Sequence, residues 1–130
     1  MNDKKTILIV DDDIDFLTQM QIHFSEHNFN VITAEGQKRA EAILQKQLPD
    51  LAIIDLMMED VDGGFALAYH IKKMNSFIPV IIATAVSSET GMEFDATTEE
   101  ERSWVKADVF LAKPIRFEQL LREVNRLLAE

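Results

Sequence analysis

Short apolar runs alternate along this chain with longer segments in which apolar residues recur every three or four positions. The runs cover residues 7–10, 31–34, 51–54, 80–83 and 109–112, and each contains Ile or Val. Short runs of this kind, separated by helical patterns, are typical of buried strands in a parallel sheet. The pattern therefore predicts an α/β doubly wound sheet of five strands with helices on both faces.

Four of the segments between and after the runs have apolar residues at helical spacing. Asp12 or Asp13 is a suitable N-cap for the first helix, and Pro49 closes the second. The last helix has the clearest pattern, because its apolar residues follow Phe117 at steps of three and four. The helical positions are Ile14, Leu17, Met20 and Phe24; Ala40, Ile43, Leu44 and Leu48; Leu67, Ile71 and Met74; and Phe117, Leu120, Leu121, Val124, Leu127 and Leu128.

Composition limits the class of protein. The chain has 130 residues, of which 47% are hydrophobic, and this suits one globular domain. The net charge of -10 repels nucleic acid and anionic membrane surfaces, so a protein partner is expected. The first apolar run is too short for a signal peptide or a membrane span, which predicts a cytoplasmic protein. His23, His27 and His70 lie on helical stretches without metal-ligand neighbours and are predicted to be surface or partly packed residues.

Four of the predicted strands end at residues that can take part in phosphoryl transfer. Three aspartates, residues 11–13, follow the first run, and Asp55 follows the run at residues 51–54. Thr84 and Lys113 follow the last two runs. Because the carboxyl ends of parallel strands line one crevice, where ligands bind, we expect these side chains to meet there.

Aspartates that cluster at this edge require a cation. Two unit charges about 4 Å apart repel by about 4 kcal/mol at an effective dielectric of about 20. Lys113 neutralises one of the charges of Asp11, Asp12 and Asp55, and a divalent ion matches the rest. An all-oxygen site with few carboxylates suits Mg2+, which keeps several waters and binds phosphate oxygens. Asp55 is then the natural nucleophile and forms an aspartyl phosphate, with Lys113 and Thr84 on the phosphoryl oxygens.

Five motifs, in order, resemble those of the receiver domain of two-component response regulators, a CheY-like superfamily. The resemblance covers nearly the whole chain, and the order and spacing of the motifs make it highly specific. It implies a flavodoxin-like fold with strand order 2-1-3-4-5, in which residues 1–130 form a single receiver domain with a core of about 5–129 and no output domain. The motifs are Ile7 to Asp13, Asp55 to Met58, Asp62 and Gly63, Ile82 to Ala85, and Phe110 to Pro114.

The resemblance implies the identity of the phosphoacceptor and of the metal ligands. Asp55 is implied to accept a phosphoryl group from a histidine kinase or a histidine phosphotransfer protein. Asp11, Asp12 and Asp55 are implied to bind Mg2+, together with the backbone carbonyl of Met57. The chain would then be a phosphorylation-controlled switch in a phosphorelay.

Three further residues receive roles from the resemblance. Thr84 and Lys113 are implied to bind phosphoryl oxygens, so that the domain assists its own phosphorylation and dephosphorylation and is a regulatory domain, not an enzyme. Phe110 is implied to act as a switch residue with Thr84, although core filling explains this ring equally well. The motifs do not define the downstream protein partner, and a homodimer is a further expectation.

Two other functions are compatible with the sequence. Glu59 stands where the family usually has proline, and residues 87–101 form an enlarged segment. Both departures leave open a receiver fold that binds its partner without phosphorylation. Three aspartates after an apolar strand also resemble the start of small Mg2+-dependent phosphatases of the haloacid dehalogenase type, in which Asp11 is the nucleophile. That family needs a cap and further acidic motifs, which 130 residues hardly accommodate.

Overall fold

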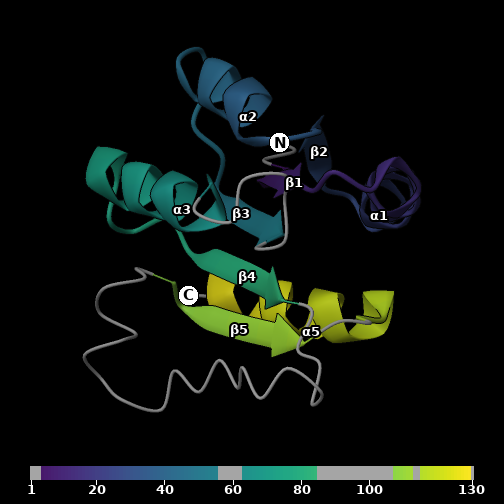
Figure 1. The fold of residues 1–130 in the computed structure, drawn as a ribbon. Coiled ribbons are helices and arrows are strands. Elements are labelled where there is room, and N and C mark those ends of the chain that lie inside the picture. The colour runs from purple at the N-terminus through teal and green to yellow at the C-terminus, as the bar shows by residue number, and fades with distance from the viewer. Residues whose placement is uncertain (1–3, 56–62, 85–106, 113–114, 130) are drawn as a thin grey trace.

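The computed structural model describes residues 4–55, 63–84, 107–112 and 115–129. Within these residues, five strands form one sheet in the order β2-β1-β3-β4-β5, and every neighbouring pair is parallel. This arrangement, seen in Figure 1, confirms the predicted fold and strand order. The strands are β1 (Thr6–Val10), β2 (Asn30–Ala34), β3 (Leu51–Asp55), β4 (Val80–Thr84) and β5 (Val109–Ala112).

Four helices belong to the described part of the chain and cover both faces of the sheet (Figure 1). Helices α2 and α3 pack on one face, and α1 and α5 pack on the other. Asp13 is the N-cap of α1, and its side chain accepts hydrogen bonds from the amides of Asp15 and Phe16. The helices are α1 (Ile14–Glu26), α2 (Gln37–Leu44), α3 (Gly63–Met74) and α5 (Phe117–Leu128).

The sheet separates two apolar cores, because successive residues of a strand point to opposite faces. In β3, Leu51 and Ile53 join the core under α1 and α5, whereas Ala52 and Ile54 join the core under α2 and α3. All four side chains are at most 1% exposed. Burial of each large aliphatic side chain contributes about 1.5–3 kcal/mol. Packing on both faces therefore fixes the position of each strand in the sheet, and with it the position of the residues at the strand's carboxyl end.

Two predicted helical faces are longer than the observed ones. Helix α2 ends four residues before Leu48, which is 43% exposed. The three residues after the helix are Gln, Lys and Gln, which provide no apolar contact, and a residue before proline avoids the helical conformation. Met74, the last residue of α3, is also 43% exposed, whereas Leu67 and Ile71 are buried as predicted. The apolar faces of both helices therefore end one turn early.

Candidate functional site

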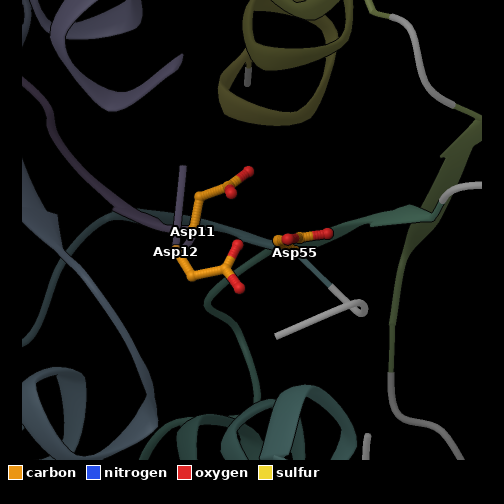
Figure 2. A group of neighbouring side chains, drawn as sticks. All are labelled: Asp11, Asp12 and Asp55. Carbon is orange, nitrogen blue, oxygen red and sulfur yellow. The ribbon is translucent and has the colours of Figure 1, made fainter. Parts of the chain in front are cut away.

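The carboxyl ends of β1 and β3 bring three aspartates together. The two strands are neighbours in which Val10 pairs with Ile54, so the residues that follow lie at the same edge of the sheet. Asp11, Asp12 and Asp55, here called the acidic cluster, each contribute one carboxylate oxygen to a group whose members lie within 4.8 Å of one another. Figure 2 shows the three carboxyl groups close together, although Asp55 is distant in the sequence. The predicted convergence of these side chains is confirmed.

Burial and local hydrogen bonds hold the cluster in place. Asp11 is 1% exposed and Asp55 is 3% exposed, whereas Asp12 is exposed to solvent. The Asp13 amide donates a hydrogen bond of 2.9 Å to Asp11 Oδ1. The Asp11 amide donates to the carbonyl of Ala34 on β2. The segment between β1 and α1 therefore orients Asp11 through its own backbone.

The donor set of the acidic cluster fits a hard divalent cation. All three side chains offer carboxylate oxygens, the ligand type that Mg2+ prefers, and oxygens within 4.8 Å of one another can share one ion. Buried carboxylates at this separation repel one another, so a cation lowers the energy of the arrangement. Because Asp12 is exposed, an ion can enter from solvent and keep some of its waters. The cluster is therefore suited to an ion with open coordination positions.

The other predicted site residues lie on β4 and β5 or outside the described residues. Thr84 is the last residue of β4 and pairs with Ala112, the last residue of β5. Lys113 follows Ala112 in the sequence but, like Met57, lies outside the described residues. Phe110 is partly buried and packs against the core under α2 and α3. The backbone places Thr84 at the predicted edge, and the phosphoryl contacts of Thr84 and Lys113 stay predictions.

Two aspartates at the opposite edge of the sheet have contacts that sequence reasoning missed. Asp50 Oδ2 accepts a hydrogen bond of 2.7 Å from the Thr6 amide. Asp108 Oδ2 accepts one of 2.8 Å from the Val80 amide and lies 2.7 Å from Lys72 Nζ. Each aspartate stands directly before an apolar run. This position was the signal in the sequence that could have marked both residues as belonging to the amino ends of strands.

The histidines have neighbours that their spacing did not reveal. The ring of His23 stacks on Phe117 with 4.9 Å between the centroids, and His27 Nδ1 lies 2.9 Å from the His23 carbonyl oxygen. His70 Nδ1 lies 2.6 Å from Glu41 Oε2 and so links α3 to α2. Among the described residues, only the acidic cluster forms a group of three or more candidate metal ligands. The histidines are therefore surface or partly packed residues, as predicted.

Comparison with known proteins decides the family. A sequence model of the response regulator receiver domain matches residues 7–125, which include both strand ends of the acidic cluster. The chain belongs to the response regulator receiver family. A receiver domain of this kind is the phosphoacceptor switch of a two-component system and is a regulatory domain. Membership also decides against the haloacid dehalogenase alternative.

Curated relatives of this receiver domain are longer than the chain. The transcriptional regulatory protein ZraR of Escherichia coli (strain K12) is 34% identical over 129 residues, which cover 98% of this chain and 27% of ZraR. The heme response regulator HssR of Staphylococcus aureus (strain bovine RF122 / ET3-1) is 32% identical over 123 residues, which cover 93% of this chain and 50% of HssR. The chain therefore spans a quarter to a half of the length of these relatives.

A solved structure resembles the receiver domain over nearly its whole length. The response regulator protein TrrA of Thermotoga maritima, in complex with Mg2+ and BeF, has a TM-score of 0.75 at 26% identity. The likeness covers 95% of this chain and 99% of that one.

Among the described residues of our chain, no helix combines the length and apolar character needed to cross a membrane.

Proposed function

We propose that Asp55 accepts a phosphoryl group from the phosphohistidine of a histidine kinase or of a histidine phosphotransfer protein. The convergence of buried Asp55 with Asp11 and Asp12 at one edge of the sheet carries this proposal. A carboxylate oxygen of Asp55 attacks phosphorus while the bond from phosphorus to the histidine nitrogen breaks. The product is an aspartyl phosphate on β3, and the donor imidazole, which carries a proton on its other ring nitrogen, leaves as the neutral ring.

The acidic cluster and the backbone carbonyl of Met57 hold Mg2+ in this proposal. When bound, the ion neutralises charge on the phosphoryl oxygens during transfer. The Asp13 amide orients the Asp11 carboxylate through a hydrogen bond. Because Asp12 is exposed, waters and the incoming phosphoryl group have room beside it. The likeness to TrrA, which was solved with Mg2+ and BeF, supports this choice of ion.

Two residues beyond the cluster bind the phosphoryl oxygens in this proposal. Thr84 donates a hydrogen bond to one oxygen, and the Lys113 ammonium pairs with another. Together with Mg2+, they allow the domain to assist its own phosphorylation and dephosphorylation. This role agrees with the position of Thr84 opposite Ala112 at the end of the β4 and β5 pair.

The same contacts convert phosphorylation into a change of conformation. Movement of Thr84 toward the phosphoryl group alters the packing of Phe110, which lies opposite Ile82 on the neighbouring strand. Phosphorylation thereby shifts a pre-existing equilibrium toward a state with a different surface around α5. A coupling of about 1–3 kcal/mol is enough for a useful change in the affinity of a partner.

The partners of this receiver domain are proteins. A histidine kinase or phosphotransfer protein supplies the phosphoryl group, and a second protein surface, on a separate chain or on an output domain, responds to it. A homodimer is one form that this response takes in our proposal. The net charge of -10 opposes direct contact with nucleic acid or an anionic membrane and fits a cytoplasmic location.

Labelling with a small phosphodonor tests the assignment of Asp55. Acetyl phosphate and Mg2+ should add one acid-stable, base-labile phosphoryl group per chain, detected by mass spectrometry. Asp55→Asn should remove the label, whereas Asp13→Asn should keep it, because asparagine is as good an N-cap as aspartate. Label that survives Asp55→Asn refutes the assignment.

A partner-binding measurement separates this switch from an interaction module that does not use phosphorylation. A phosphorylation-controlled switch should bind its downstream partner differently before and after labelling. The difference should disappear in Asp55→Ala. Equal affinity of wild-type protein, Asp55→Ala and Asp55→Glu for that partner would favour the module.

A further inference from the structure

At the amino ends of two strand pairs, an aspartate makes the same two hydrogen bonds from one strand to the other. This arrangement is here called the closure of the pair. Between β1 and β3, the Asp50 amide donates to the Thr6 carbonyl at 2.8 Å, and the Thr6 amide donates to Asp50 Oδ2 at 2.7 Å. Between β4 and β5, the Asp108 amide donates to the Val80 carbonyl at 2.9 Å, and the Val80 amide donates to Asp108 Oδ2 at 2.8 Å. In both pairs, a side-chain carboxylate takes the place of a strand carbonyl.

The two closed pairs carry different halves of the phosphoryl-transfer site at their other ends. The β1 and β3 pair ends in the acidic cluster. The β4 and β5 pair ends with Thr84 opposite Ala112, and Lys113 is the next residue in the sequence. A slip of one residue turns every side chain of a strand to the opposite face. The register of each pair therefore decides whether the groups at its carboxyl end can meet.

Lys72 reinforces the closure between β4 and β5. Its Nζ lies 2.7 Å from Asp108 Oδ2 and donates a hydrogen bond of 3.3 Å to the Ser76 carbonyl. The Lys72 side chain is 15% exposed and the Asp108 side chain is 37% exposed, so solvent still reaches this ion pair. The contact ties the end of α3 to the residue that precedes β5.

We propose that Asp50 and Asp108 are positioning residues for phosphoryl transfer, each for one half of the site. Asp50 aligns the acidic cluster for Mg2+, and Asp108 aligns the end of the β4 and β5 pair, where Thr84 lies, for the phosphoryl oxygens. This inference rests on the proposed function of the site. The two effects are separable, because carboxylates that share a bound ion draw β1 and β3 back into alignment. Saturating Mg2+ provides no such link between β4 and β5.

Two alanine variants test the division between the halves. Asp50→Ala should raise the Mg2+ dissociation constant by about tenfold, the lower end of the range for groups bonded directly to a metal ligand, because Asp50 acts on the ligands only through β1 and β3. At saturating Mg2+, its rate of labelling by acetyl phosphate should return to that of the wild type. Asp108→Ala should leave the Mg2+ dissociation constant unchanged and slow labelling at saturating Mg2+ by about tenfold to about a hundredfold. Calorimetry on the unphosphorylated protein gives the first quantity, and mass spectrometry over time gives the second.

Matched variants separate positioning from a general loss of stability. Asn75→Ala removes the acceptor of a 3.0 Å hydrogen bond from the Phe77 amide in the loop before β4, without breaking a contact between strands. This control should change neither quantity. Asp50→Asn and Asp108→Asn keep an oxygen that can accept the amide hydrogen bond, and they should restore most of the lost function. Where an alanine variant does not fold, the glutamate variant displaces the same oxygen by one methylene and should give the same split.

The outcomes distinguish this inference from the proposed function. Equal losses of Mg2+ affinity and labelling rate in both alanine variants, or losses no larger than those of Asn75→Ala, overturn the inference. Wild-type protein that binds Mg2+ but takes no label at Asp55 refutes the proposed function instead. In that case the effect of Asp50→Ala on Mg2+ affinity still tests the β1 and β3 half.

Discussion

The two edges of the sheet use aspartate in opposite ways. At the edge where the strands begin, here called the amino edge, Asp50 and Asp108 each accept a hydrogen bond from a strand amide, and Asp108 also pairs with Lys72. At the edge where the strands end, here called the carboxyl edge, the acidic cluster places one oxygen from each of three carboxylates within 4.8 Å of the others, and two of the carboxylates are buried. Carboxylates paired with donors stabilise the fold. Asp11 also accepts a hydrogen bond, but the charges gathered around it favour the arrival of a cation. One residue type therefore supports structure at one edge and chemistry at the other.

The largest effect on stability should come from binding of Mg2+ to the acidic cluster at the carboxyl edge. Mg2+ at about 100 times its dissociation constant should raise the free energy of unfolding by about 2.7 kcal/mol, because the unfolded chain lacks the acidic cluster. Thermal unfolding with and without Mg2+ measures this change. Asp55→Asn should show a much smaller shift. An equal shift in wild type and variant would place the stabilising ion away from the acidic cluster.

Removing a carboxylate from the amino edge should destabilise the protein. Asp108→Ala should lower the free energy of unfolding by about 1–3 kcal/mol, because the Val80 amide and the Lys72 ammonium both lose an acceptor. Asp108→Asn, which keeps one oxygen for the amide, should lose less. Urea unfolding in the absence of Mg2+ measures both variants. An unchanged midpoint for Asp108→Ala would show that this closure contributes no stability.

Neutralising a carboxylate at the carboxyl edge should have the opposite sign. In EDTA, Asp55→Asn should raise the free energy of unfolding by about 1 kcal/mol, because it removes repulsion from Asp11 and Asp12. The same urea experiment measures this gain beside the loss in Asp108→Ala. A less stable Asp55→Asn would mean that the other contacts of Asp55 outweigh the repulsion, and the contrast between the edges would then fail.

The smallest effect should come from the ion pair at the amino edge. Lys72→Gln should lower the free energy of unfolding by about 0.5 kcal/mol, the usual range for a pair that solvent still reaches. The difference from wild type should shrink in about 1 M NaCl, where the Debye length is about 3 Å. A loss that is independent of salt would assign the role of Lys72 to packing of its aliphatic chain.

Most of the fold was predictable, because its signals are local. The apolar run at residues 51–54 forms a buried strand, and the steps of three and four after Phe117 form α5. The error at Leu48 arose where an apolar residue continued the helical spacing beyond the end of α2, and Met74 lies within α3 but is 43% exposed. Whether such a residue is buried depends on what packs above it, and that contact is made by distant parts of the chain.

The acidic cluster was predictable for a different reason. Parallel strands emerge at one edge, so Asp11, Asp12 and Asp55 could be placed together from their positions after apolar runs. The same logic was available for the aspartates that precede apolar runs. It could not supply their partners, because the amides of Thr6 and Val80 belong to strands that lie next to Asp50 and Asp108 only after folding.

The sequence by itself determined the order of strands and helices along the chain, most of the apolar positions of the helices and the strand ends that carry the acidic cluster. These properties follow from the spacing of apolar residues and from the single direction of parallel strands. Only the tertiary structure decided that Asp13 and not Asp12 caps α1, and that Asp50 and Asp108 close the amino edge. The roles of Asp50 and Asp108 depend on backbone amides that come within hydrogen-bond distance only when strands from remote segments pack together. The cap depends on where the helix begins, which places the amides of Asp15 and Phe16 beside Asp13.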